Sequence, residues 1–116
     1  MAAPSAEARR PETSRAVLDR PIYTISVAAE ILRTHPRTLM TYEQLGLLTP
    51  QRTASNRRRY SQRDLLTIQA IQRLTRDHGL NLNGARHVIE LLQALAAHGL
   101  DRPSFLADVD VTHVRL

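Results

Sequence analysis

A short segment with a marked start and a marked stop, RTHPRTLMTYEQLGLL (residues 33–48), constrains the fold more than any other feature. Pro36 suits the first helical position, because its missing N–H would have no partner there anyway. Gly46 suits the left-handed conformation that ends many helices. The segment therefore predicts a short helix from Pro36 to Leu45, with polar side chains outward and Leu39 and Leu45 as its apolar anchors.

A second helix is expected just before this one. Ser26 is a plausible N-cap, and apolar residues follow at helical spacing from Val27 to about Arg33. The turn 34–35 joins the two helices. A helix, a short turn and a second helix form the arrangement that places the second helix in a DNA major groove while the first braces it.

The following segment, LTPQRTASNRRRYS, predicts a small β-hairpin. Pro50 and the polar run 53–56 are typical of a turn, so strands are expected at 49–53 and 57–60. Three consecutive arginines lie on the returning strand. Taken alone, they fit a solvated strand equally well; beside a helix-turn-helix they indicate a wing that contacts phosphates or a minor groove.

Two longer helices are predicted in the second half of the chain. Ser61 and Asp64 have the S-x-x-D spacing of a capping box, which starts a helix that runs from Gln62 to about His78. A last helix follows from about Leu82 to His98, with Asn81 as its N-cap. Its apolar stripe is wide enough for two surfaces, so four of its residues are expected to form a dimer interface: Val88, Ile89, Leu92 and Leu95.

Positive charge is concentrated in one part of the chain. The net charge is +5, and residues 21–65 hold seven arginines against three acidic residues, so +4 of that excess lies there. A basic face of this kind favours a polyanion as the partner.

Other classes of function find little support. The chain has no cysteine, which excludes disulfides and thiolate metal sites, and its five histidines lack ligand spacing. No catalytic or phosphate-cradling motif is present, so we expect neither an enzyme nor a cofactor or metal site. No apolar run approaches the roughly 20 residues that span a bilayer. A cytoplasmic protein without a membrane partner is expected.

The two ends of the chain read as tails. Residues 1–20 lack the continuous apolar centre of a secretory signal and are expected to be flexible. In residues 100–116, Pro103 discourages further helix, and the apolar residues that follow are interrupted by acids. This segment either folds back over the dimer helices or stays partly extended as an apolar strip.

The order of these motifs resembles the DNA-binding half of MerR-type regulators from Ile22 to about Leu92. The matching positions are Tyr23 and Ile25, Ala28, Pro36-Arg37-Thr38-Leu39, Tyr42-Glu43, Gly46-Leu47, Pro50-Gln51-Arg52, Arg58-Arg59-Tyr60-Ser61 and Asp64-Leu65. The segment GLNLNGARHVIELL also resembles the family's entry into the next helix.

The resemblance implies a mainly α fold, a winged helix-turn-helix with a C-terminal dimerisation helix. The DNA-binding domain would cover 21–80 and the dimerisation helix 81–99, and a homodimer would bind an inverted repeat of double-stranded DNA. Arg37, Thr38 and Thr41 would lie nearest the bases. The remaining DNA-binding residues would position the backbone: Tyr23, Tyr42, Arg52, Arg57, Arg58, Arg59 and Tyr60.

Within the family, several segments look most like the heat-shock repressors. That likeness implies repression of chaperone genes with a DnaK-type chaperone as co-repressor. Met40 stands where the family commonly has arginine, and Arg33-Thr34 where it commonly has Gly-Val, so operator choice is expected to differ. Two alternatives stay open: a MerR-like chaperone modulator that binds protein, and a ligand-sensing activator, although residues 100–116 are few for a pocket domain.

Overall fold

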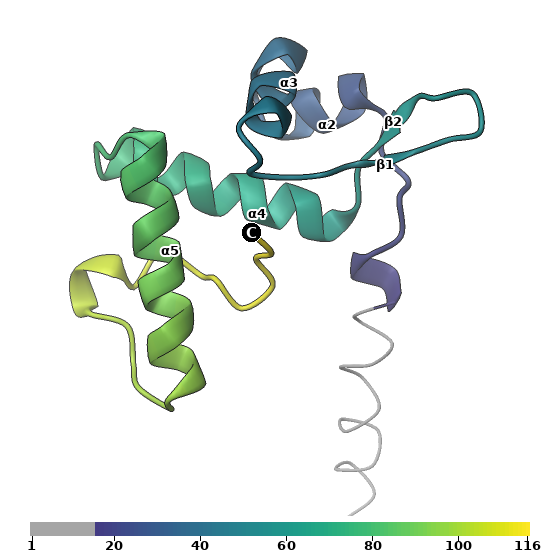
Figure 1. Ribbon diagram of the computed structural model, residues 1–116. Helices are drawn as coiled ribbons and strands as arrows, with labels where there is room; N and C mark the ends of the chain where they lie inside the picture. The colour runs from purple at the N-terminus through teal and green to yellow at the C-terminus, as the bar shows by residue number, and fades with distance from the viewer. Residues whose placement is uncertain (1–15) are drawn as a thin grey trace, which may run out of the picture.

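The structure, a computed structural model, describes residues 16–116 and is mainly helical, as predicted (Figure 1). No helix within this range combines the length and the apolar character needed to cross a membrane. The elements in chain order are α2 (Ile25–Ile31), α3 (Pro36–Gln44), β1 (Gln51–Arg52), β2 (Arg58–Arg59), α4 (Gln62–Gln72), the π-helical segment η1 (Arg73–Asp77), α5 (Leu82–Ala97) and the 3-10 turn η2 (Ser104–Leu106).

Helix α2 begins earlier than the sequence predicts. Thr24 has an extended backbone and its side chain accepts a hydrogen bond from the Val27 N–H at 3.2 Å, so Thr24 and not Ser26 is the N-cap. Thr and Ser are both competent caps. Ala28 and Ala29 are buried in the core.

Helix α3 has the predicted start and stop. Pro36 opens it, Gly46 follows it with φ of 76°, and His35 is the N-cap, whose Nδ1 accepts from the Arg37 N–H at 3.0 Å. Leu39 is fully buried, but Leu45 is 52% exposed, so its predicted role as an anchor is wrong. Residue 45 is already the C-cap, and the second anchor is Tyr42, one turn after Leu39 on the same face.

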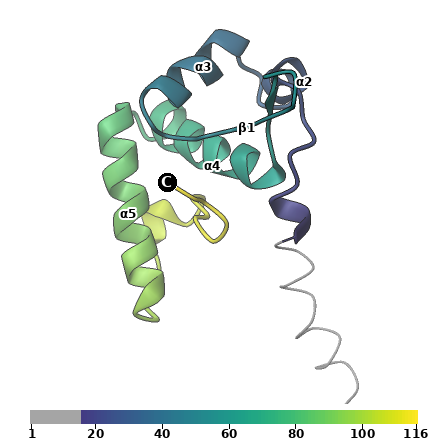
Figure 2. The same ribbon diagram turned by 45° about the vertical axis from the view of Figure 1, so that its right-hand side comes forward.

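Helix α4 lies beneath two helices of the first half of the chain. Both ribbon views place it below the pair α2 and α3, with α5 across its far end (Figures 1 and 2). The capping box is confirmed, since the Ser61 Oγ accepts from the Asp64 N–H at 3.1 Å and the Asp64 carboxylate from the Ser61 N–H at 3.0 Å. The predicted helix continues past Gln72, but as the π turn η1. The core around α4 is aliphatic and includes Leu65, Ile68, Ile71 and Leu74.

Helix α5 starts at the predicted N-cap, where the Asn81 side chain accepts from the Gly84 N–H at 2.7 Å. Ile89 and Leu92, two predicted dimer residues, are 0% and 2% exposed within one chain. Their assignment to an interface is therefore wrong, because the chain's own core already covers them. Val88 and Leu95 are half-buried at the edge of that core.

The C-terminal segment folds back into the space between α4 and α5. Its apolar residues Leu106, Val109, Val111 and Val114 are buried, which contradicts the extended apolar strip. The segment folds back, as the alternative expects, and it packs on helices of its own chain. The Gln93 amide on α5 donates to the Val114 carbonyl at 3.0 Å. Other polar contacts hold the segment to α4: Arg115 N to Thr67 Oγ1 at 3.2 Å, and Arg63 to the His113 carbonyl at 3.2 Å.

Part of the predicted N-terminal tail is ordered. Residues 1–15 lie outside the described range, but residues 16–18 are helical and Leu18 is buried. The Asp19 carboxylate accepts from Arg63 at 2.7 Å and from Arg115 at 3.0 Å. The hydrogen bond from Arg63 lowers the pKa of Asp19. The flexible assignment is thus wrong for residues 16–20, because the sequence does not reveal partners so distant along the chain.

Candidate nucleic-acid interface

The polar face of α3 begins in its first turn. Arg37 and Thr41 lie four residues apart, hence on one face, and both are exposed. The Thr41 hydroxyl donates to the Arg37 carbonyl at 3.0 Å. Thr38 is half-buried beside them, and Met40 is 36% exposed. The guanidinium of Arg37 therefore stands at the N-terminal end of the helix, where a reading helix contacts base edges.

The β-hairpin adds a second basic element beside α3. Its strands pair antiparallel with Gln51 opposite Arg59 and Arg52 opposite Arg58, which confirms the predicted hairpin in a shorter form. Because directly paired residues share a face, Arg52 and Arg58 lie side by side, and Arg59 lies on the other face. Figure 1 shows the hairpin loop extending away from the helices.

One carboxylate from α3 joins the helix to this hairpin. Glu43 accepts from Arg58 Nε at 2.7 Å through one oxygen and from Arg52 at 3.1 Å through the other. Two like charges opposite each other in a hairpin repel, so a carboxylate between them offsets that repulsion. The hydrogen bond to Glu43 raises the pKa of the Arg58 guanidinium. We call this unit, Glu43 with Arg52 and Arg58, the Glu43 bridge.

The bridge separates the predicted DNA-binding arginines into two groups. Arg52 and Arg58 are engaged inside the protein, with side chains 38% and 26% exposed. Arg37, Arg57 and Arg59 form no ion pair with another residue of the described range. Arg57 is exposed at the hairpin turn, and Arg59 is half-buried with one N–H donated to the Arg58 carbonyl at 2.9 Å. Among the predicted DNA-binding arginines, these three hold the positive charge that remains for an outside anion.

Tyr23 fastens the start of α2 to the hairpin. It forms an isolated antiparallel bridge with Tyr60, with backbone hydrogen bonds of 2.9 Å and 2.7 Å. Its hydroxyl donates to Gln62 Oε1 at 3.2 Å, and the side chain is half-buried. Tyr23 thus has a structural role, and its predicted phosphate contact stays a prediction.

Two further tyrosines predicted to contact DNA belong to the core. Tyr60 is 0% exposed, and burial raises the pKa of its hydroxyl to about 12. Tyr42 is 8% exposed, and burial also raises its pKa, although the charge of Arg76 acts against this. The predicted side-chain contact to DNA is wrong for Tyr60, because its hydroxyl is enclosed in the core. The ring of Tyr42 also packs in the core, and a phosphate contact through its hydroxyl stays a prediction.

Two polar residues that hold the site together, Glu43 and Gln62, are not among the residues that the sequence predicts for DNA binding. The hairpin register is the signal that could predict the role of Glu43. It places two arginines opposite each other, and their repulsion is lowered by an acidic residue nearby.

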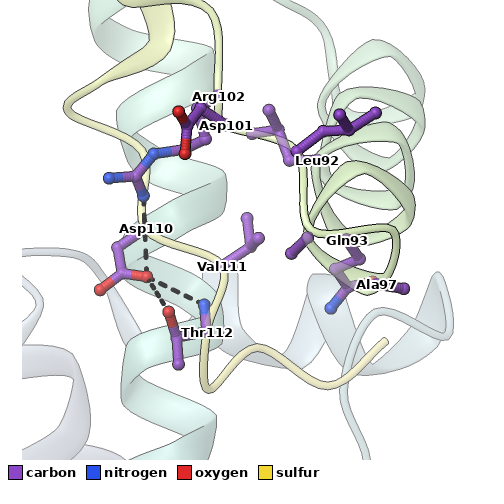
Figure 3. A pocket seen from close by; sticks show the side chains of 10 residues that line it. Leu92, Gln93, Ala97, Asp101, Arg102, Asp110, Val111 and Thr112 are labelled. Carbon is purple, nitrogen blue, oxygen red and sulfur yellow. Dashed lines mark hydrogen bonds and ion pairs between the residues drawn. The ribbon is translucent and has the colours of Figure 1, made fainter.

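A separate hollow lies between α5 and the C-terminal segment (Figure 3). Its volume is about 690 Å³. On its polar side Asp110 accepts from the Thr112 hydroxyl at 2.6 Å and lies 3.7 Å from Arg102, so these two charges offset each other. Asp101 leaves the lining with one net negative charge. It shares no residue with the basic elements on α3 and the hairpin.

Comparison with known proteins shows the family of the chain. Residues 23–92 match the family described as MerR HTH family regulatory protein. The chain is 48% identical over 85 residues to the "putative heat shock protein HspR" of Streptomyces coelicolor, with 68% of this chain and 56% of that protein covered.

More distant relatives share the same region. The HTH-type transcriptional repressor CarH of Myxococcus xanthus is 32% identical over 77 residues, which cover 65% of this chain and 25% of CarH. The HTH-type transcriptional regulator GlnR of Bacillus anthracis is 32% identical over 69 residues, which cover 60% of this chain and 53% of GlnR. The chain thus spans from a quarter to just over half of the length of these relatives. Since the family match takes in more than half of it, the chain belongs to the MerR family of helix-turn-helix regulatory proteins.

Proposed function

We propose that the chain is a sequence-specific DNA-binding transcriptional regulator. Helix α3 enters the major groove, where Arg37 reads a guanine through two hydrogen bonds and Thr41 and Thr38 contact neighbouring base edges. The hairpin is the wing of a winged helix-turn-helix, with Arg57 and Arg59 on phosphates.

The Glu43 bridge is the observation that carries this proposal. It joins the reading helix to the hairpin through two charge-assisted hydrogen bonds, so the two basic elements are held at a fixed spacing. Positioning through the backbone and reading through the bases require such a fixed relation. A solvated surface strand with no binding role would not need the Glu43 bridge.

We further propose a homodimer on an inverted repeat. The side of α5 that faces away from its own core exposes Leu91 at 64%, flanked by the half-buried Val88 and Leu95. A twofold axis through this surface would pair like residues and present two copies of α3 to two half-sites.

Repression of chaperone genes is the regulatory role that we propose, with a DnaK-type chaperone as co-repressor. Support comes from the identity to the "putative heat shock protein HspR", which is higher than to CarH or GlnR. Most of the C-terminal apolar residues are packed, but Phe105 is 72% exposed, so a chaperone would meet η2 and not an extended strip.

The proposal is tested by fluorescence anisotropy with a labelled inverted-repeat duplex from the promoter of a chaperone operon and a scrambled duplex. Arg37→Ala should lose about 1 to 3 kcal/mol on the operator only. Replacing Arg57 and Arg59 together by alanine should weaken both duplexes. If four phosphate contacts per dimer are lost, the slope of log affinity against log salt becomes shallower by roughly 3 to 4.

Arg20→Ala, an exposed position outside both elements, is the control for loss of charge. Equal binding of operator and scrambled duplex by the parent protein would overturn the assignment as a sequence-specific regulator. An unchanged salt slope in the Arg57 and Arg59 variant would remove the wing from the phosphate backbone.

A further inference from the structure

A second basic groove lies between the end of α2 and the far end of α4. It has a volume of about 490 Å³ and shares no residue with the proposed DNA contacts. Three guanidinium groups and one carboxylate line it, so the lining is positive overall. Its charged residues are Arg33, Arg73, Arg76 and Asp77, and its other residues are Ile31, Leu32, Gln69 and Gln72.

Arg33 occupies this groove at a conformational cost. Its φ is 53°, in the left-handed region that disfavours residues with a Cβ, and glycine would adopt it without strain. The backbone position is defined by hydrogen bonds around it, including Arg33 N to the Glu30 carbonyl at 3.2 Å and Thr34 N to the Ala29 carbonyl at 2.9 Å. Its guanidinium has no ion-pair partner among residues 16–116. The turn therefore needs the conformation but not the arginine side chain.

The other two arginines come from the π segment η1. Arg73 is held by Asp77 at 3.0 Å and lies 3.9 Å from Asp108, whereas Arg76 is exposed and makes no ion pair within the described part of the chain. The π turn η1 ends α4 and is followed by the loop that leads to α5. Here the π turn carries the basic wall of the groove.

Apolar surface borders the same groove on α2. Ile31 is 46% exposed, and Val27, one turn earlier on the helix, is 43% exposed. The Gln72 amide is used internally, since it donates to the Leu32 carbonyl at 3.1 Å, but Gln69 is exposed. A ligand in this groove thus meets arginine forks, one exposed amide and a β-branched apolar edge.

We propose that this groove docks an acidic segment of a partner protein, with carboxylates on Arg33 and Arg76 and an apolar side chain against Val27 and Ile31. Guanidinium groups suit carboxylates because their N–H groups form a planar fork. A peptide matches this combination better than a DNA backbone does, since a peptide can place an aliphatic side chain next to its carboxylates. The interaction is separate from the proposed DNA contacts and does not depend on them.

The test uses a fluorescein-labelled peptide in which aspartate and glutamate alternate with leucine, and a control peptide with asparagine and glutamine in place of the acids. Anisotropy titrations on the full chain should show binding of the acidic peptide only. Arg76→Ala and Arg33→Gly together should weaken it roughly 3- to 20-fold, because each exposed ion pair contributes modestly. Arg20→Ala should leave it unchanged.

Arg33→Gly separates a binding role from a structural one. Relief of the left-handed strain should raise the melting temperature while peptide affinity falls, and unfolding cannot produce that combination. No binding of the acidic peptide by the parent chain, or equal binding of the neutral peptide, would overturn the proposal. So would a loss of duplex affinity in Arg76→Ala as large as its loss of peptide affinity, since the groove would then lie on the DNA backbone.

Discussion

Replacing Glu43 with glutamine removes one charge and leaves the shape of the side chain nearly unchanged. In the parent protein the carboxylate accepts at 2.7 Å from Arg58 and at 3.1 Å from Arg52. Glutamine keeps one acceptor oxygen and places an NH2 group where the second oxygen was, so one guanidinium loses its partner. The two paired arginines then repel each other without compensation.

The magnitude follows from the exposure of each pair. Glu43 and Arg58 are about a quarter exposed, so their charge-assisted hydrogen bond is expected to contribute about 1.5 to 3 kcal/mol. Arg52 is 38% exposed, and its pair is discounted to about 0.2 to 1 kcal/mol. Glutamine retains part of the first bond, so we expect Glu43→Gln to lower the free energy of unfolding by about 2 kcal/mol. Urea denaturation measures this loss.

Glu43→Gln should change the affinity for a scrambled duplex and the preference for the operator in opposite directions. The released arginine can neutralise one more phosphate per subunit, which steepens the slope of log affinity against log salt by roughly 0.9 for each. Affinity for a scrambled duplex should therefore rise, while the preference for the operator falls because the hairpin no longer has a fixed place beside α3. Anisotropy titrations between 50 and 200 mM salt follow both quantities.

Glu30→Gln is the matched control, because it makes the same change of charge at an exposed position of α2. If Glu30→Gln and Glu43→Gln changed the salt slope, the specificity and the stability equally, the effect would be one of net charge. The reasoning about the bridge would then be refuted.

Tyr60→Phe should raise the stability by about 1 kcal/mol, because it removes a buried hydroxyl for which residues 16–116 provide no hydrogen-bond partner. The folded pKa of Tyr60 is about 12 against 10 when unfolded, so the free energy of unfolding is unaffected by this group below pH 10 and falls by up to about 2.7 kcal/mol as pH rises through 12. Urea denaturation should not find this loss in Tyr60→Phe. His35→Ala should cost about 1 kcal/mol by the same assay, whereas His35→Asp should retain the cap of α3. Leu91→Glu should give a folded monomer in sedimentation experiments, and Leu92→Glu should unfold the chain; a parent protein that is already a monomer would contradict the proposed dimer.

Local signals in the sequence predict much of this fold. Pro36 and Gly46 mark α3, Ser61 with Asp64 marks α4, and Asn81 marks α5, because each signal acts through a hydrogen bond or a backbone preference within a few residues. The hairpin is also recoverable, although its paired strands are shorter than expected.

Features that depend on distant neighbours escaped the same reasoning. An apolar stripe on α5 predicts that one side of the helix is buried, but it does not show which residues cover that side. The sequence therefore predicts Ile89 and Leu92 at a dimer interface, whereas they lie in the chain's own core. Family position placed Tyr60 on DNA, whereas the fold encloses it. Glu43 is 9 residues from Arg52 and 15 from Arg58, and only the hairpin register brings the three together.

The contact between Asp19 and Arg115 closes a loop of 96 residues, almost the whole described chain. Contacts of such sequence separation form late in folding, after local turns and helix pairs have reduced the entropy of closure. The two end segments should therefore behave as one cooperative unit that opens at a lower free energy than α2, α3 and α4. In native-state hydrogen exchange, the amides of residues 109–115 would exchange together and well before those of α4, while α2, α3 and the hairpin stay folded.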